Sequence, residues 1–552
     1  MIHDLWYKHA VIYCLDVETF LDSNGDGIGD FVGLTARLDY LAGLGVTCVW
    51  LLPFYTSPNR DNGYDVSDYY SVQRKTGTFG EFVEFMNRAR QLGLRVIADL
   101  VVNHTSDQHP WFRAARRDPQ SEYRNWYVWS KKRPRDWNKG MVFPGVQKST
   151  WTRDAVAGEY YFHRFYDFQP DLDIHNPAVK EEVMRIMGFW LELGVSGFRV
   201  DAVPFVVSRK GAGVRSHIKD YELLHEMRHF LQWRRGDAIL LAEANVPPTE
   251  SMEYFGDNGD RLQMMLNFWV NQRIFYALAS GDTRPLQDAL TATYQRPYEA
   301  QWGNFLRSHD ELDLGRLTTH QRQIVFDAFG PDKPMQLYNR GIRRRLAPML
   351  NNDRRRIELA YSLMFTLPGT PVLRYGDEIG MGDDLRLPER QGARTPMQWS
   401  SDRHGGFTSG RRPCTPVIDD AIYGYKKVNV ADQRRDPQSL LNWMERVIRM
   451  RKECPEIGWG DWKILRTEPH VLAMRYDWND RATIIVHSFV DRPTVVRLRV
   501  EGPGGERLVN LLSNDQSEAG ESGRHVIELE PYGYKWYRVG GLDPAMTPAR
   551  SA

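Results

Sequence analysis

Cysteine is scarce in this chain of 552 residues, which has only four, Cys14, Cys48, Cys414 and Cys454. No two are close in sequence, so the spacing indicates neither a disulfide framework nor a metal-ligand cluster. Cys14 and Cys48 lie in apolar runs, where we expect buried free thiols. This usage suits a reducing compartment.

An excess of one charge and a long apolar run are also absent. Lys and Arg number 72 against 71 Asp and Glu, a net charge of +1, which gives no argument for nucleic acid or an acidic membrane as partner. No apolar run approaches the roughly 18 residues that indicate a membrane span, and residues 1–8 lack the pattern of a signal peptide. We therefore expect a soluble cytoplasmic protein. Two arginine clusters, at 343–345 and 354–356, are interpreted as a solvated or ion-paired face.

What the chain does have is an alternation of strand-like and helix-like segments. Apolar residues make up 42% of it, enough for a large core. Helical spacing separates most of the strand candidates, which is typical of repeated βα units and predicts an α/β fold built on a (β/α)₈ barrel. The eight strand candidates are residues 10–15, 46–54, 94–102, 195–203, 238–242, 262–270, 304–307 and 371–375.

Two stretches depart from the repeat. Residues 105–173 are too long for an ordinary βα loop and predict an inserted domain after the third strand. Beyond about residue 460, alternating apolar runs separated by Gly- and Pro-bearing turns predict a C-terminal antiparallel β-sandwich. The expected units are a barrel of residues 1–104 and 174–459, the inserted domain, a sandwich of residues 460–543 and a tail of residues 544–552.

Three strand-like runs end in a carboxylate: Asp201, Glu243 and Asp310. The C-terminal ends of barrel strands converge on one pocket, and carboxylates acting in pairs cleave glycosidic bonds. Arg199 points to the same side of its strand as Asp201, so we expect it to keep Asp201 ionised as a nucleophile. Burial would raise the pKa of Glu243, as an acid/base requires. A single carboxylate is more often a cap or an ion-pair partner, but three in this order favour catalysis.

These residues also resemble the four defining motifs of the α-amylase superfamily, glycoside hydrolase family 13. The motifs are Asp99 to His104, Gly197 to Asp201, Glu243 after its strand, and His309-Asp310. The resemblance implies Asp201 as nucleophile, Glu243 as general acid/base and Asp310 as transition-state stabiliser. It also implies that His104, Arg199 and His309 surround the glucose of the first subsite.

Further segments resemble family motifs that bind this glucose. The segment Asp61 to Val66 resembles one whose tyrosine, here Tyr64, stacks on the sugar. The segment Arg394 to Trp399 resembles one whose arginine pairs with the residue matching Asp61 and closes the pocket, which implies exo-action on small α-glucosides. Residues 169–173, beginning with Gln169, resemble a motif of oligo-1,6-glucosidases and trehalose synthases.

The stretch from Asp22 to Asp30 has oxygen-bearing residues at calcium-loop spacing. We expect Ca²⁺ there as a structural cofactor, held by Asp22, Asn24, Asp26, the carbonyl of Ile28, and Asp30. The twelfth position is Gly33 instead of a bidentate Glu, so the loop is not a full EF-hand, and a metal-free turn stays the alternative.

Within the family the chain is most similar to the trehalose-synthase subgroup, whose members interconvert maltose and trehalose. Segments 341–359 and 376–384 carry this likeness, whereas Val246 and Ser308 depart from it near the pocket. Three hypotheses remain open: an isomerase of this type with side hydrolysis, an α-glucosidase or transglucosylase on short α-glucosides, and a non-catalytic sugar-binding protein. Oligomeric state and acceptor stay open.

Overall fold

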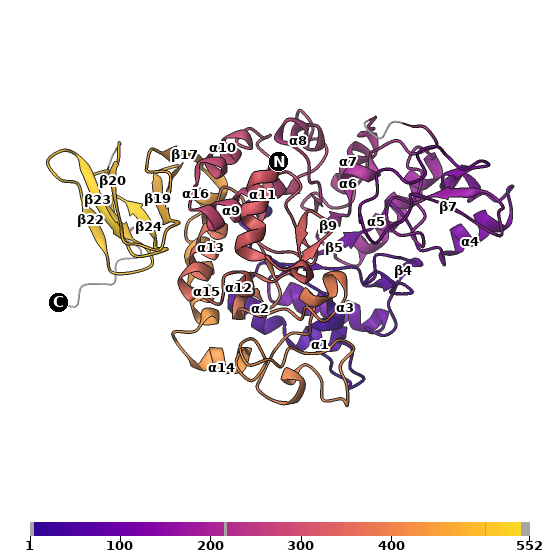
Figure 1. Cartoon of the computed structure of the whole chain (residues 1–552), viewed down its shortest axis with the longest axis horizontal. Coiled ribbons are helices and arrows are strands. Elements are labelled where there is room, and N and C mark those ends of the chain that lie inside the picture. Colours follow the sequence, from indigo (N-terminus) through magenta and orange to yellow (C-terminus); the bar gives the residue numbers. More distant parts are fainter. Residues whose placement is uncertain (1–4, 215–217, 503, 542–552) are drawn as a thin grey trace.

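The computed structural model describes residues 5–214, 218–502 and 504–541, and its centre is a closed barrel of eight parallel strands (Figure 1). The order around the barrel is β1-β16-β12-β11-β10-β9-β5-β2. All eight coincide with or overlap the strands predicted from the sequence, so the barrel is confirmed. Their bounds are β1 Ile12–Leu15, β2 Cys48–Leu51, β5 Arg95–Leu100, β9 Gly197–Val200, β10 Ile239–Ala242, β11 Met264–Leu266, β12 Gln301–Phe305 and β16 Thr370–Arg374.

One predicted strand was too long. We expected residues 262–270 to be extended, but β11 ends at Leu266. The side chain of Asn267 accepts a hydrogen bond from the backbone N–H of Val270 and thereby begins helix α9 (Phe268–Ser280). The apolar run continues through this change because both elements are buried, so hydrophobicity by itself did not mark the boundary.

Helices surround the barrel. Helix α3 shows why they form: Thr78 and Glu81 make a reciprocal capping box, and Phe82, Phe85 and Met86 are buried on one face. The helices of the chain, besides α9, are α1 Phe31–Ala36, α2 Leu38–Leu44, α3 Phe79–Gln91, α4 Pro110–Arg117, α5 Pro177–Glu192, α6 Val203–Val206, α7 Glu222–Arg234, α8 Pro248–Phe255, α10 Arg284–Ala292, α11 Thr319–Phe329, α12 Leu346–Met349, α13 Arg354–Thr366, α14 Val430–Arg435, α15 Leu440–Lys452 and α16 Glu456–Trp459.

The barrel strands that carry catalytic candidates approach each other closely. Gly197 begins β9 with a backbone φ of +143°, and a Cβ atom there would lie 2.2 Å from the carbonyl oxygen of Ile239 in β10. Only glycine, which has no Cβ atom, fits where the two strands approach so closely. Apolar side chains such as Trp50 and Ile97 fill the interior of the barrel, so it is a packed core and its functional surface lies at the strand ends.

Three segments outside the barrel follow the C-terminal ends of barrel strands and carry small sheets of their own. The inserted segment after β5 contains α4 and a three-stranded sheet, and it lies to one side of the barrel in Figure 1. A second excursion follows β12 and contains α11 and another three-stranded sheet. A two-stranded hairpin follows β2. The strands are β6 Trp129–Ser130, β7 Trp151–Arg153 and β8 Tyr160–Phe162 in the insert, β13 Leu312–Asp313, β14 Gln336–Leu337 and β15 Gly341–Ile342 in the second sheet, and β3 Tyr55–Thr56 and β4 Asp68–Val72 in the hairpin.

The C-terminal part consists of two antiparallel sheets, as the alternating pattern predicted. One has the order β17-β18-β19-β24-β21-β22 and the other pairs β20 with β23, whose residues alternate between buried and exposed. The predicted tail, residues 544–552, lies outside the described residues. The strands are β17 Asp461–Leu465, β18 Val471–Trp478, β19 Arg481–Ser488, β20 Thr494–Arg499, β21 Arg507–Asn510, β22 Gln516–Glu518, β23 Arg524–Leu529 and β24 Tyr534–Val539.

Three observations bear on the remaining expectations. The thiols of Cys14, Cys48 and Cys454 are buried and free, and Cys414 is exposed and free. The interpretation of residues 343–345 as a solvated or ion-paired face is confirmed in its ion-paired form, because Arg344 pairs with Asp383 and the fully buried Arg345 with Asp377, both at 3.4 Å. In the part of the chain that the structure describes, no helix has the length and apolarity that crossing a bilayer requires.

Candidate active site

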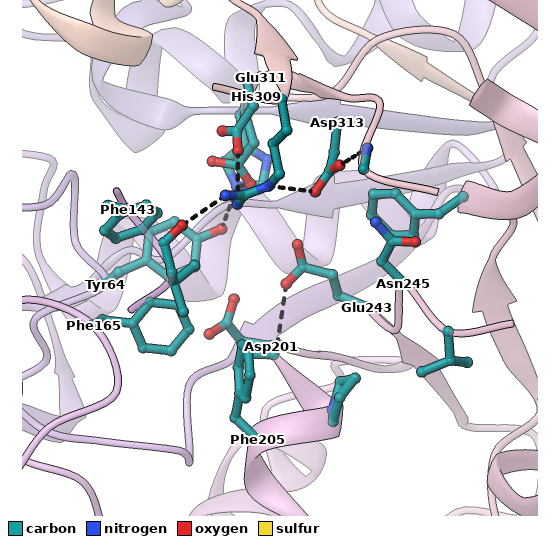
Figure 2. Close-up of a pocket in the computed structure, with 18 of the residues that line it drawn as sticks. Tyr64, Phe143, Phe165, Asp201, Phe205, Glu243, Asn245, His309, Glu311 and Asp313 are labelled. Atoms are coloured by element: carbon teal, nitrogen blue, oxygen red, sulfur yellow. Dashed lines mark hydrogen bonds and ion pairs between the residues drawn. The ribbon is translucent and has the colours of Figure 1, made fainter. Parts of the chain in front are cut away.

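A pocket of about 500 Å³ opens at the C-terminal ends of the barrel strands, and the three predicted catalytic acids all line it. Asp201 follows β9, Glu243 follows β10 and Asp310 lies a few residues beyond β12. Figure 2 shows Asp201 and Glu243 facing the same space, with His309 and Tyr64 across from them. Parallel strands thus bring together side chains more than 100 positions apart in sequence.

Arg199 joins the acids at the floor of the pocket. Its Nη1 lies 2.7 Å from an oxygen of Asp201 and its Nη2 lies 2.7 Å from an oxygen of Glu243. Nη1 also pairs with Asp99 on the neighbouring strand β5. The side chain is 1% exposed, so little water competes for these contacts. A guanidinium presents its donors in a fixed planar fork, and here that fork sets the relative positions of two candidate catalytic carboxylates.

Asp201 differs electrostatically from the sequence-based expectation. Burial raises its pKa well above the ordinary value, and the nearby carboxylates of Glu243 and Asp99 act in the same direction. Arg199 lowers the pKa of Asp201, as expected, but does not outweigh burial. Burial likewise raises the pKa of Asp99 to about 6, against the effect of Arg199. The single positive charge of Arg199 therefore interacts with three carboxylates, those of Asp99, Asp201 and Glu243.

Glu243 is mostly buried, with 25% of its side chain exposed at the pocket. One of its oxygens accepts a hydrogen bond of 3.1 Å from the backbone N–H of Ala202. Ala202 has a backbone φ of +49°, an uncommon conformation for a residue with a side chain. Such strain concentrates at functional sites, and here it directs an N–H group at a candidate acid/base.

Asp310 lies among positive charges. Its Oδ1 is 2.6 Å from Arg390 and 3.0 Å from Arg394, and its Oδ2 is 3.1 Å from Nε2 of His309. Burial opposes ionisation, but His309, Arg390 and Arg394 together hold the pKa of Asp310 well below its usual range. Burial lowers the pKa of His309 itself to about 3, so the lasting positive charges are those of the two arginines.

The ion pair predicted between Arg394 and Asp61 was wrong. Arg390 takes this place, with Nη2 3.0 Å from Asp61, while Arg394 donates to the side chain of Asn62 at 2.7 Å and to the carbonyl of His309 at 2.8 Å. Gln169 completes the group by donating to Asp61 at 2.9 Å. The physical reason is distance. Arg394 is hydrogen-bonded to the carbonyl of His309, next to Asp310, whereas Arg390, four residues earlier in the chain, reaches Asp61.

The remaining predicted sugar-contacting side chains also converge. The ring of Tyr64 stacks on that of His309, with centroids 5.5 Å apart and planes 8° apart, and their polar atoms are 2.8 Å apart. His104 is buried at the pocket edge, with Nε2 3.1 Å from the carbonyl of Tyr64. Burial lowers the pKa of His104 to about 4. Both imidazoles are therefore neutral near pH 7 and suited to hydrogen bonds with hydroxyl groups.

Val246 and Ser308, which depart from the trehalose-synthase pattern, differ in where they lie relative to the pocket. Val246 lines the pocket and is 6% exposed. Ser308 serves the backbone: its hydroxyl accepts from the N–H of Asp310 at 3.3 Å, and its carbonyl accepts from Arg374 at 2.9 Å. Val246 thus shapes the cavity directly, whereas Ser308 supports the turn that presents Asp310.

Several pocket residues were not predicted, among them Arg390, described above, and Arg340. It follows Tyr338 and Asn339, both in the left-handed region, in the turn between β14 and β15. Its Nη1 donates to the carbonyl of Val142 in the inserted domain at 2.9 Å, and its Nε lies 3.0 Å from Asp313. Arg340 therefore ties the inserted domain to the second excursion across the mouth of the pocket.

An aromatic contact supports this tie. Phe143 packs against Tyr166 and Tyr338, with centroid separations of 4.9 Å in both cases, and both tyrosine hydroxyls donate to Glu389. Figure 2 shows Phe143 and Phe165 on the Tyr64 side of the pocket. The sequence patterns did not predict this wall. We call the set Phe143, Tyr338, Arg340 and Glu389 the closing contact.

The predicted calcium loop was tested against its hydrogen bonds. One oxygen of Asp22 accepts from the N–H groups of Asn24 and Gly25, and the other accepts from the N–H of Gly27 and the hydroxyl of Thr408. A carboxylate has about four lone-pair sites, and these donors occupy them.

The other predicted ligands behave similarly. Asp30 accepts from Ser23 and caps α1, while Asn24 and Asp26 accept from the backbone N–H of Asp26 and Ile28. Across residues 5–214, 218–502 and 504–541, no three His, Cys, Asp or Glu side chains gather in a metal-binding arrangement. The loop as described does not fit Ca²⁺, and calcium binding stays a prediction from sequence.

Comparison with known proteins gives a consistent result. Residues 15–328 and 335–460 match the family model described as alpha amylase, catalytic domain, and residues 481–538 match the C-terminal domain of sucrose hydrolase-like proteins. The chain is 40% identical over 554 residues to the trehalose synthase/amylase TreS of Mycolicibacterium smegmatis, covering 98% of this chain and 93% of that one. It is 30% identical over 600 residues to the oligo-1,6-glucosidase of Parageobacillus thermoglucosidasius, covering 97% and 99%.

Comparison with solved structures gives a similar result. The crystal structure of the trehalulose synthase MutB from Pseudomonas mesoacidophila superposes with a TM-score of 0.75 at 26% identity, covering 97% of this chain and 99% of that chain. The pocket described above therefore lies on a scaffold shared with proteins named for α-glucoside chemistry.

Proposed function

Since the chain belongs to the α-amylase family of carbohydrate-active enzymes, we propose that it acts on short α-glucosides by a retaining mechanism and chiefly interconverts maltose and trehalose. The coarser assignment, to α-glucoside transglucosylases and hydrolases, follows from the family and its relatives. The isomerase activity and the roles of individual residues are the proposal.

In the first half-reaction an oxygen of Asp201 attacks the anomeric carbon of the non-reducing glucose. The bond to the glycosidic oxygen breaks, and Glu243 gives that oxygen a proton, which leaves a glucosyl ester on Asp201 and a free glucose. Asp310 accepts hydrogen bonds from sugar hydroxyls as positive charge develops on the ring. The neutral imidazoles of His104 and His309 contribute further hydrogen bonds.

In the second half-reaction Glu243, now a carboxylate, removes a proton from the attacking hydroxyl. If the retained glucose turns so that its anomeric hydroxyl attacks, maltose becomes trehalose. If water attacks, the product is two glucose molecules. Exclusion of water therefore decides the ratio of isomer to hydrolysis product.

The observation that carries the proposal is the bridge made by Arg199. One guanidinium contacts both Asp201 and Glu243 at 2.7 Å and so holds the two carboxylates beside each other, as a retaining mechanism with a nucleophile and an acid/base requires. The ion pair of 3.0 Å between Asp61 and Arg390 in the pocket lining, to which Gln169 adds a hydrogen bond, supports action on a terminal glucose, because the family motif places such a pair behind the non-reducing sugar.

The test is the product pattern from maltose in the presence of free ¹³C-labelled glucose. We expect trehalose to form with little label, because the retained glucose is the acceptor, together with a smaller amount of glucose. Heavily labelled trehalose would indicate that the acceptor exchanges with solution. Glucose as the sole product would contradict the isomerase and favour the second candidate.

That second candidate is an exo-acting α-glucosidase or transglucosylase. It is favoured by Val246, an aliphatic residue of the pocket wall at which the chain departs from the trehalose-synthase pattern. A changed wall can admit water or another acceptor. Longer oligosaccharides among the products would identify a transglucosylase. A purely sugar-binding role is not consistent with the membership of an enzyme family.

A further inference from the structure

A second pocket, of about 640 Å³, lies on the flank of the barrel between α2, the segment 399–406 and α14. It shares no lining residue with the catalytic pocket. Helices α2 and α14 lie on the lower side of the molecule in Figure 1. The lining residues include two arginines, the half-buried Arg37 and the exposed Arg434.

Arg37 is half-buried and lacks an anion. The centre of its guanidinium lies 4.2 Å above the ring of Trp399. Among the residues that the structure describes, no carboxylate lies within ion-pair distance of it, and its buried Nε has no acceptor. Burial lowers the pKa of Arg37, which reflects the cost of a charge removed from water without a partner. An anion from solution would remove that cost.

Arg434 approaches the same place from α14. Its guanidinium lies 5.3 Å from the ring of Tyr40, and it too has no carboxylate partner within the described parts of the chain. The rings of Tyr40 and Trp399 are 5.1 Å apart. The two guanidinium groups therefore lie over adjoining rings on two walls of one pocket.

Two acidic residues, Asp39 and Asp402, also line this pocket. Asp39 accepts two hydrogen bonds from Arg88, of 2.9 and 3.0 Å, and Asp402 accepts from the hydroxyl of Ser400 at 2.8 Å. Neither forms an ion pair with Arg37 or Arg434. Arg37 and Arg434 thus line the cavity without a direct ion pair, although Asp39 and Asp402 line it as well.

From this arrangement we propose that the pocket is a binding site for a phosphate-class anion held between Arg37 and Arg434. Guanidinium groups donate several hydrogen bonds in a planar fork that matches the oxygens of a phosphoryl group. The phosphoryl group belongs either to free phosphate or to a sugar phosphate. Its occupancy would act on segment 394–406, because Trp399 is held to the carbonyl of Phe20 at 2.6 Å and Arg394 contacts Asp310.

The test is isothermal titration calorimetry of the purified full chain with inorganic phosphate and with glucose 6-phosphate, at an ionic strength balanced with sodium chloride. We expect saturable binding, weakened about tenfold or more by Arg434→Gln and by Arg37→Gln. Equal affinity for both ligands indicates free phosphate as the ligand, and tighter binding of glucose 6-phosphate at this site indicates a sugar phosphate. The matched control is Arg435→Gln on the same helix, whose side chain is 82% exposed.

Arg434→Gln is the decisive variant, because loss of the Arg37–Trp399 contact can itself weaken the fold. The absence of saturable binding of either ligand would overturn the proposal. So would binding that Arg434→Gln leaves unchanged, or that Arg435→Gln weakens equally, since either result would place the anion elsewhere or make it a general charge effect.

Discussion

Arg390 joins Asp61 to Asp310, with Nη2 3.0 Å from one carboxylate and Nη1 2.6 Å from the other. One side chain thus connects the end of the donor pocket to the candidate transition-state stabiliser. Because the guanidinium is rigid, a shift of either acid moves the other. Arg390 therefore couples an acid of the pocket lining to the positively charged surroundings of Asp310.

The first prediction concerns the nucleophile. Asp201→Asn should lower kcat on maltose by at least about 1,000-fold, because an amide cannot form the glucosyl ester. Circular dichroism should show a fold equal to that of the unchanged protein. Asp288→Asn, at an exposed position of α10, is the matched control and should retain full activity. Unchanged turnover in Asp201→Asn would show that the carboxylate assignment is wrong.

The second prediction concerns pH. Asp201 must be ionised to attack, and burial raises its pKa, so kcat/KM should fall as pH is lowered through that raised value. Arg199 lowers the pKa of Asp201, so Arg199→Gln should move the acid limb of the profile to higher pH by about one unit or more. Arg185→Gln, on an exposed face of α5, should leave the limb in place. A limb that does not move in Arg199→Gln would rule out this coupling.

The third prediction concerns the closing contact. Arg340→Ala removes the hydrogen bond to Val142 and the ion pair with Asp313, so water should enter the pocket more freely. We expect the ratio of glucose to trehalose formed from maltose to rise about threefold or more. Arg322→Ala, on α11 and outside the pocket lining, is the control. An unaltered product ratio would mean that Arg340 has only a structural role.

The fourth prediction concerns a buried acid outside the site. Glu378 accepts hydrogen bonds from Tyr13 and Tyr40 at 2.6 and 2.7 Å, and burial raises its pKa from 4.5 to about 7. A raised pKa means that the folded state binds the proton more tightly. Its contribution to stability is therefore greatest below pH 4.5 and is lost as pH rises through about 7.

Glu378→Gln cannot ionise, so its Tm should decline less than that of the unchanged protein between about pH 5 and pH 8. The corresponding difference in unfolding free energy is up to about 3 kcal/mol. Thermal melts at several pH values measure it, with the exposed Glu181→Gln as control. Parallel pH curves for Glu378→Gln and the unchanged protein would contradict the prediction.

The fifth prediction concerns calcium. If the carboxylate of Asp22 keeps its four hydrogen bonds, calcium added to chelator-treated protein should change Tm by less than about 1 °C. A saturable rise of several degrees would show instead that the loop rearranges to bind the ion, as its sequence spacing predicts. Asn24→Ala should abolish such a rise.

Much of the architecture could be predicted from the sequence, because hydrophobic periodicity reports directly on what is buried. The barrel strands, the C-terminal sheets and the three strand-end acids were located in this way. The boundary at Asn267 was missed, since a buried strand and a buried helix are equally apolar and only the cap distinguishes them.

Which chemical groups stand at the ends of which strands follows from the order of residues alone, because strand order and side-chain alternation are local properties of the chain. The folded arrangement sets which ion pairs and hydrogen bonds those groups make. Arg390 in place of Arg394 at Asp61, the partial exposure of Glu243, and the contact between Arg340 and Val142 all depend on distances between segments far apart in sequence. The physical reason is that ion pairs and burial act through space, so no spacing along the chain encodes them.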